Sequence, residues 1–356
     1  MITRLWGAAV ALLCAIAVLL SFFAYEIPTP LTWAILLLGS GGVATYTVTQ
    51  GLTFYVLRRM LEALFAVWVI ATFTFVLLRV LPGGPFDSEK ALPAEVLANL
   101  EKKYKLNEPL IKQYGDYMLG LVQGDLGQSY KYITRDISSI IIESLPNSVQ
   151  LGVYALLISY LIGIPMGVFA GWKPGSKLDF ACMTFAISGI ALPSFLMAPI
   201  FIMIFVKKLH WFEPALWEGP LYYVLPMVIL GIRPAAVIAR LTRASVLEVI
   251  HSDYIRTAKA KGLNARTILF KHVLRNSLIP VLSLSGPLAA AILTGSFVIE
   301  QIFAIPGVAK HLVLSVTNRD YPLILGTTLI FSIILVMANL ITDLLTAIVD
   351  PRVKMS

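Results

Sequence analysis

The stretch DYIRTAKAKGLNARTILFKHVLRN at residues 253–276 carries six lysines and arginines and lies between two long apolar runs. Over all 356 residues, 58% are apolar, only 13% are charged, and the mean hydropathy is +0.82. A soluble domain of this length needs a charged surface, which this composition cannot supply. We therefore expect an integral membrane protein of the all-α class, a bundle of spanning helices in which the basic stretch is a loop.

Eight apolar runs are long enough for a spanning helix, which needs about 20 apolar residues. The two N-terminal runs predict a transmembrane hairpin over residues 1–53. The first of them is expected to stay as an uncleaved anchor, because no clear small-x-small cleavage site follows it. The expected spans are Leu5–Tyr25, Leu31–Gln50, Arg59–Leu81, Asn147–Trp172, Phe180–Val206, Gly219–Ala239, Asn276–Ile299 and Tyr321–Thr342.

The charges of the connecting loops set the expected orientation. Basic residues gather on short cytoplasmic loops, whereas long loops cross largely regardless of charge. With a cytoplasmic N-terminus, the inner loops and the termini hold more than half of the 28 lysines and arginines. Both termini and the loop 246–276 are therefore expected inside, and the long loop 82–145 outside. The net charge of +8 then reflects topology, and no nucleic-acid partner is expected.

The sequence lacks the patterns typical of an enzyme. Cys14 and Cys182 lie inside apolar runs, which predicts neither a disulfide nor a metal site. No histidine lies within an expected span, and no paired nucleophile and base stand out, which disfavours an intramembrane hydrolase. No G-x-x-x-x-G-K-[ST] phosphate loop is present, so the chain is not expected to hydrolyse ATP itself.

The long loop has local structure of its own. ALPAEVLANLEKKYKL at 91–106 places apolar residues at helical spacing and predicts a short amphipathic helix. LVQGDLGQSY at 121–130 predicts a turn at the membrane surface. A lid packed on the helix ends and a docking surface for an external partner are both consistent with these patterns.

Residues 246–276 predict two short amphipathic helices around a sharp turn. A stripe of side chains that shrink along the chain recurs at four-residue spacing. It consists of Val246, Ile250, Tyr254, Ala258 and Gly262. Gly262 supplies a helix breaker and Asn264 a cap for a second helix, Ala265–Arg275. Contact with anionic lipid requires only charge, whereas an apolar helix face also suits a groove of a cytoplasmic partner.

DYIRTAKAKGL resembles the cytoplasmic coupling loop, or EAA loop, of permease subunits of bacterial ABC importers, in its peptide-importer form. The positions of the E-A-A-x-x-x-G pattern read Arg256, Thr257, Ala258 and Gly262. Where the broader pattern has I-x-L-P, residues 272–275 read HVLR. These departures argue against a sugar-importer loop and agree with the peptide branch.

Further stretches resemble the B-type subunit of oligopeptide permeases over residues 54–353, with residues 1–50 outside the resemblance. They are LRVLPGGPFD (78–87), YKLNEPLIKQYGDYMLGLVQGDLGQSY (104–130), ALPSFLMAPIFIMIF (191–205), GSFVIEQIFAIPGVAK (295–310), NRDYPLI (318–324) and VDPRV (349–353). The resemblance implies a type I ABC importer permease fold, MetI-like, over 54–356, with six core helices to which the N-terminal hairpin adds two.

The same resemblance implies a function and partners. The chain would form half of the translocation pathway for oligopeptides across the bacterial inner membrane, paired with a homologous permease subunit. Two cytoplasmic ATPases would bind ATP and Mg, and an extracytoplasmic binding protein would deliver the peptide. The chain itself would need no cofactor. Dipeptides, nickel or glutathione are alternative substrates, and an autonomous secondary transporter is an alternative class.

Two groups of candidate site residues follow. The ATPase-docking residues are Tyr254, Arg256, Thr257, Ala258, Lys261 and Gly262. Arg233 and Glu300 are candidates for the translocation pathway, because ionisable groups in spans are costly and often functional. Arg233 could equally snorkel to the interface, and Glu300 could touch the delivery protein or an outer gate. Asp343 is interpreted as structural.

Overall fold

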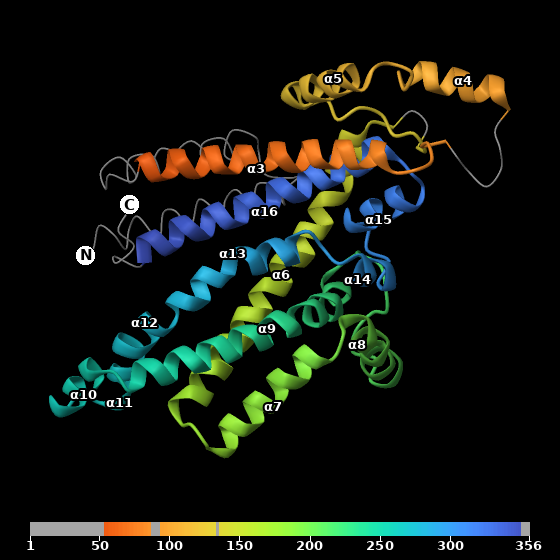
Figure 1. Ribbon diagram of the computed structural model, residues 1–356. Helices are drawn as coiled ribbons and strands as arrows, with labels where there is room; N and C mark the ends of the chain where they lie inside the picture. The colour runs from red at the N-terminus through yellow and green to blue at the C-terminus, as the bar shows by residue number, and fades with distance from the viewer. Residues whose placement is uncertain (1–52, 87–92, 133–134, 350–356) are drawn as a thin grey trace, which may run out of the picture.

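The computed structural model describes residues 53–86, 93–132 and 135–349, and within these ranges it is a helical bundle with only one isolated β-bridge. The helices run between two ends of the bundle (Figure 1). One end carries α10, α11 and α12, and the other carries α4, α5, α14 and α15. The expected hairpin 1–53 lies almost entirely outside the described residues, as do the last residues of the chain. The expectation of an all-α membrane protein is confirmed.

Five helical segments of the described residues are long and apolar enough to cross a membrane. They are α3 (Thr53–Val80), α6 (Ile137–Trp172), α9 (Pro220–Ile250), α13 (Ile279–Leu293) taken with α14 (Phe297–Ile302), and α16 (Tyr321–Val349). All five segments differ from their expected bounds, and the largest differences are in α6 and α9. α6 begins at Ile137, so the end of the expected loop 82–145 is helical, and α9 extends to Ile250 rather than Ala239.

The expected span Phe180–Val206 is not one straight helix. α7 (Lys177–Ala191) is followed by α8 (Ser194–Phe201) and the π-helical segment η1 (Ile202–Lys208), and the two parts are bent by 105°. The cause lies at Pro193, because a proline drives the preceding residue out of the helical region. Leu192 accordingly has φ −87° and ψ 118°. Within the described residues, the bent pair gives a sixth span if it crosses as one unit.

α6 and α9 are the most extensively packed pair of helices, and small residues bring their backbones together. Gly163, Gly167 and Gly171 recur at four-residue spacing along α6 and face α9. A Cβ atom added at Gly163 would lie 2.6 Å from the Ala235 carbonyl oxygen, and one at Gly167 would lie 2.5 Å from the Ala239 oxygen. Such small-xxx-small spacing is typical of close packing between membrane helices.

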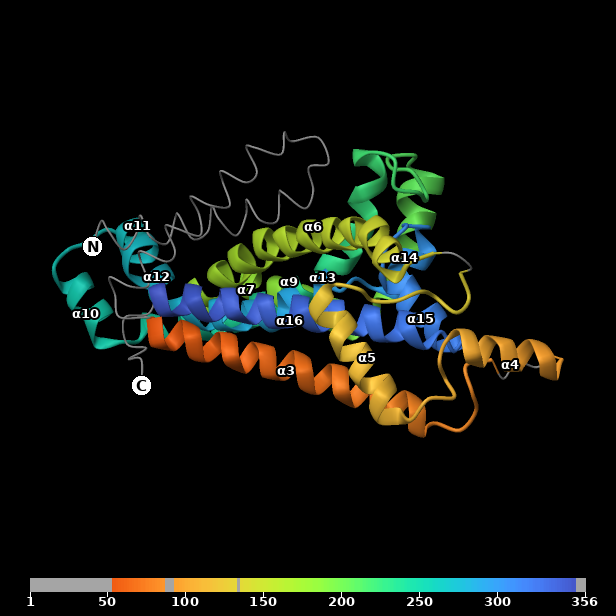
Figure 2. The ribbon, with the colours of Figure 1, turned by 90° about the horizontal axis from the view of Figure 1, so that it is seen from above.

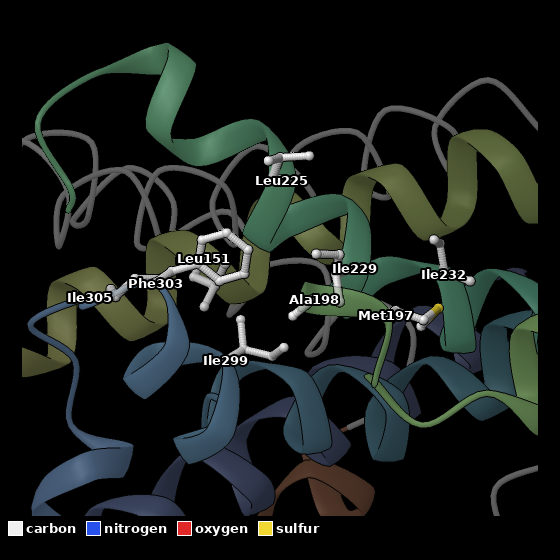
Figure 3. Packing of buried hydrophobic residues seen from close by; sticks show 9 residues of the cluster. All are labelled: Leu151, Met197, Ala198, Leu225, Ile229, Ile232, Ile299, Phe303 and Ile305. Atoms are coloured by element: carbon white, nitrogen blue, oxygen red, sulfur yellow. The ribbon is translucent and has the colours of Figure 1, made fainter. Parts of the chain in front are cut away.

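Near the α15 end, an apolar cluster joins α6, α8, α9 and α14 (Figure 3). It consists of Leu151, Met197, Ala198, Leu225, Ile229, Ile232, Ile299, Phe303 and Ile305. Met197 and Ala198 come from α8, so the segment after the 105° bend is held against α9. The corner at Pro193 is therefore packed into the bundle.

The remaining long helices form a second packed group, in which α16 lies against both α13 and α3 (Figure 2). The Arg59 Nε of α3 lies 3.3 Å from the Asp343 Oδ2 of α16, as the structural interpretation of Asp343 requires. At the other end of α16, the Ser129 hydroxyl and the Tyr130 N–H donate to the buried Asp320 carboxylate. These bonds tie the segment after α5 to the start of α16.

The expected helix in the long loop is confirmed as α4 (Ala94–Lys103). A second helix, α5 (Leu110–Gln123), lies across α3 and α16 (Figure 2). Its Tyr114 hydroxyl lies 2.8 Å from the Thr72 Oγ1 of α3, and its Tyr117 ring stacks on Phe75. The predicted turn follows at Gly124, which has φ +76°. α5 of this loop therefore packs on the bundle, as the lid interpretation expects.

Candidate functional site

The basic stretch follows the C-terminal end of α9 and folds as two short helical arms joined by a turn. α9 ends at Ile250, Ser252 is extended with φ −71° and ψ 152°, and α10 runs over Asp253–Ala260. The expected stripe from Val246 to Gly262 assumed one continuous helix, and this assumption was wrong. The break at Ser252 resets the helical register, so Ile255 is fully buried whereas Tyr254 is 42% exposed.

The predicted turn and second helix are confirmed. Gly262 has φ +74°, a conformation that side-chain-bearing residues rarely adopt. The Asn264 side chain accepts a 2.7 Å hydrogen bond from the Thr267 N–H and so caps the next helix. This helix consists of α11 (Ala265–Thr267), a π-helical segment η2 (Ile268–Val273) and α12 (Leu274–Ser277).

An apolar cluster fixes this turn to the bundle. Its buried members come from α6, α9, α10 and η2, and they are Val168, Val246, Ile255, Ala258, Ile268 and Val273. A hydrogen bond of 2.8 Å from the Asn276 side-chain amide to the Tyr254 hydroxyl also joins the two arms of the turn. The loop 246–276 is therefore a folded unit continuous with α6 and α9.

The six docking candidates divide into two groups by exposure. Arg256, Thr257, Lys261 and Gly262 are exposed, and Tyr254 is exposed in part although it is engaged with Asn276. Ala258 is only 6% exposed and faces the apolar cluster. Ala258 therefore contributes by allowing α10 to approach the bundle, while the exposed residues form a surface.

Two exposed apolar side chains of the loop 246–276 were not among the sequence-based candidates. Phe270 is 68% exposed and Leu263 is 39% exposed. The available signal was their hydrophobicity within an otherwise polar stretch, but the helical register needed to orient them depends on the break at Ser252 and on the π-helical segment. We call Arg256, Thr257, Lys261, Gly262, Leu263 and Phe270 the loop surface.

The two pathway candidates lie in different surroundings. Arg233 is exposed on α9, and the described part of the chain gives it no salt-bridge partner. Its position on the bundle surface leaves both the cavity and the snorkelling interpretations open. Glu300 is only 1% exposed, so its side chain does not reach a surface where a delivery protein or substrate could touch it.

The Glu300 carboxylate instead joins three helices. It accepts a 2.6 Å hydrogen bond from the Ser148 hydroxyl of α6 and a 3.3 Å bond from the Lys310 N–H of α15 (Ala309–Thr317). Ser148 in turn accepts a 2.8 Å bond from the Val308 N–H. A buried carboxylate with these donors holds the outer helices together, and a role of Glu300 in the pathway stays a prediction.

A second buried carboxylate lies near the α10 end. Asp179 of α7 accepts two hydrogen bonds, of 2.6 and 2.9 Å, from the Arg243 guanidinium of α9, and a third from the Gly175 N–H. Its side chain is only 7% exposed. The bidentate pair therefore fixes α7 to α9. Among the described residues, no group of three or more His, Cys, Asp or Glu side chains could hold a metal ion.

Comparison with known proteins covers nearly all of the chain beyond residue 51. Residues 163–355 match the family profile of the binding-protein-dependent transport system inner membrane component, and residues 52–152 match its N-terminal counterpart. The oligopeptide transport system permease protein OppB of Salmonella typhimurium is 42% identical over 302 residues, which are 84% of this chain and 99% of that protein. The dipeptide transport system permease protein DppB of Bacillus subtilis is 44% identical over 301 residues, 85% and 98% of the respective chains.

Proposed function

This chain belongs to the family of binding-protein-dependent transport system inner membrane components, and we propose that it is the transmembrane subunit of an ATP-driven peptide importer. Its relatives named above are permeases of oligopeptide and dipeptide transport systems. The five to six apolar spans of the described residues agree with a multi-pass protein of the inner membrane. Both termini are proposed to lie in the cytoplasm, on the basis of the loop charges.

The observation that carries the mechanism is the folded loop 246–276. Its apolar side is buried against α6 and α9, while the loop surface presents two cations, a glycine turn and the Phe270 ring to the exterior. A loop that only attracted anionic lipid would need charge but no packed helices. We propose that a cytoplasmic ATPase docks on this surface and that ATP-dependent closure of two such ATPases moves the loop.

The other partners follow from the same assignment. The sequence has no phosphate-binding loop, so we propose that the ATPase subunits bind ATP and Mg and that this chain is non-catalytic. A homologous second permease subunit would supply the other half of the pathway. An extracytoplasmic peptide-binding protein would deliver substrate at the opposite end, where α4, α5 and α15 lie.

Substitution at Gly262 tests the docking. Gly262→Val strains a backbone at φ +74°, and it should abolish ATPase co-purification and peptide uptake while membrane insertion continues. Gly175→Val is a matched control, because Gly175 has φ +75° and, like Gly262, has no atom within 4 Å of an added Cβ. Normal co-purification and uptake in Gly262→Val would refute the docking role, and an equal loss in both variants would indicate general misfolding.

Substrate length is the second point to test, since one relative named above serves dipeptides. The complete transporter in proteoliposomes, with its binding protein, should take up a labelled oligopeptide that unlabelled oligopeptides compete out. Competition by dipeptides alone would assign the dipeptide function instead. The purified chain by itself should show no uptake under an ion gradient, and uptake there would assign a secondary transporter.

A further inference from the structure

A cavity of about 200 Å³ lies between α3, α5 and the start of α16. Its wall includes Phe75 and Arg79 of α3, Tyr117 of α5, and Tyr321 of α16. α5 contacts α3 at Thr72, within the apolar segment Leu57–Val80. The cavity therefore lies within or at the edge of the membrane, and its volume is below the 300–1,000 Å³ usual for sites of drug-sized ligands.

The Arg79 guanidinium in this wall is only partly used. Its Nε donates to the Gln113 side chain at 3.2 Å, one Nη donates to the Phe75 carbonyl at 3.4 Å, and its Cζ lies 3.6 Å from the centre of the Phe75 ring. These bonds employ two of five N–H groups. Among the ion pairs of the described residues, none includes Arg79.

A second polar group of the wall is also unsatisfied. The Tyr117 hydroxyl is buried and has no hydrogen-bond partner in the described part of the chain. A buried hydroxyl without a partner is costly, and a cation within the membrane zone is costly unless it is paired or reaches the interface. Both groups are therefore suited to an anionic ligand that supplies several acceptor oxygens.

The opposite charge is present as well. Asp116 and Asp125 are among the residues that line the cavity. Asp116 lies 3.4 Å from the Lys105 Nζ, and Asp125 accepts from the Gly127 N–H. Two carboxylates disfavour a purely anionic occupant, but they suit a ligand that carries an amine a few ångströms from its phosphate. The cavity thus matches a small zwitterion.

α3 also carries an exposed apolar stripe, in which Val76 and Val80 directly follow the cavity residues Phe75 and Arg79 along the chain. Val69, Phe73, Val76 and Val80 recur along one face of α3 and are 40–75% exposed. This stripe ends one residue beyond Arg79. From these observations we propose that the cavity binds the headgroup of an amine-bearing zwitterionic phospholipid, with the phosphate at Arg79 and Tyr117, the amine toward Asp116 and Asp125, and the acyl chains along the α3 stripe.

The test uses the assembled transporter in nanodiscs with defined mixtures of phosphatidylethanolamine and phosphatidylcholine. Bound lipid is counted by native mass spectrometry after detergent release. Wild type should retain phosphatidylethanolamine selectively, and Arg79→Met should reduce this retention about tenfold. Tyr117→Phe should reduce it by a smaller factor while preserving the stacked ring. Lys112→Met, which removes an exposed cation of α5 paired with Glu108, is the control and should not change it.

Free phosphoethanolamine and a dipeptide distinguish the source of the zwitterion. Neither should displace the lipid at millimolar concentration if the acyl chains contribute to binding. Displacement by phosphoethanolamine would assign the cavity to a soluble phosphate ester, and displacement by the dipeptide would assign it to the transport substrate. Unchanged lipid retention in both Arg79→Met and Tyr117→Phe would overturn the proposal.

Discussion

Gly167→Ala tests whether backbone contact between α6 and α9 holds the bundle together. The added Cβ would lie 2.5 Å from the Ala239 carbonyl oxygen and 2.5 Å from the Thr242 Cβ. Ordinary contact begins at 3.4 Å, so the helices must separate by about 0.9 Å. Because the obstructing oxygen belongs to the backbone of a helix, no side-chain rotation relieves the clash.

The expected net loss follows from two opposing effects. Overpacking of a well-packed interior costs about 1–3 kcal/mol, while alanine is favoured over glycine within a helix by roughly 1 kcal/mol. Gly167→Ala should therefore destabilise the protein by up to about 2 kcal/mol. Gly171→Ala should cost less, because its Cβ would lie 2.8 Å from the Val246 Cβ and 2.9 Å from the Arg243 carbonyl oxygen, which are smaller overlaps than at Gly167.

Thermal unfolding of the purified transporter, followed by tryptophan fluorescence, measures these effects. Gly115→Ala is the matched control, since Gly115 lies within α5 and an added Cβ would meet nothing within 4 Å. That variant should be neutral or stabilised by about 0.5–1 kcal/mol. If Gly167→Ala unfolds at the same temperature as Gly115→Ala, the close backbone contact does not carry the packing of α6 on α9.

Three further predictions concern buried polar groups. Asp179→Ala should lower the free energy of unfolding by about 3 kcal/mol, because it leaves the Arg243 guanidinium without its carboxylate. Thermal unfolding measures this loss. A double variant with Arg243→Met that is no more stable than Asp179→Ala alone would contradict the explanation. Glu300→Ala should destabilise the protein by about 2 kcal/mol and Glu300→Gln by less, because of the two only glutamine keeps an acceptor for the Ser148 hydroxyl. Equal unfolding temperatures of these two variants would contradict this. Burial and nearby positive charge lower the pKa of His311. The unfolded state therefore binds the proton at a higher pH than the folded state, and stability is lost as the pH falls through about 6.5. The free energy of unfolding measured against pH should fall less steeply in His311→Gln, and an unchanged slope would exclude His311 as the source.

The helices and turns that depend on local signals could be predicted from the sequence. Apolar length located the spanning helices, the polar side chain of Asn264 predicted the helix start that its bond to Thr267 confirms, and Gly262 predicted the positive φ that it adopts. The small residues over 163–171 are visible in the sequence, but apolar length alone does not show which face of a helix meets another.

Other features depend on contacts between distant residues. A charge-free criterion starts α6 after Glu143, yet the helix begins at Ile137, and the exposed Glu143 side chain is paired with Arg135. Charge in a span predicts a functional role for Glu300, whereas its bonds to the Ser148 hydroxyl and the Lys310 N–H become visible only in the structure. The ATPase-docking role itself remains a prediction, since exposure of the loop surface does not identify what binds there.

The packing also determines which part of the chain a docked ATPase would move. α9 has 31 residues, or about 46 Å of helix at 1.5 Å per residue. Its Leu225 lies in the apolar cluster near α14, and its Val246 lies in the cluster under the loop. The three glycines of α6 fix that helix against α9 between these clusters.

Movement of the loop alone would expose Ile255 and Val246, which are fully buried, and burying an aliphatic side chain of this size is worth about 1.5–3 kcal/mol. The break at Ser252 is therefore no free hinge, because the apolar cluster bridges it. The Asp179–Arg243 pair adds α7 to the same body, and Met197 adds α8. A force on the loop surface should consequently displace α6–α9 as one unit.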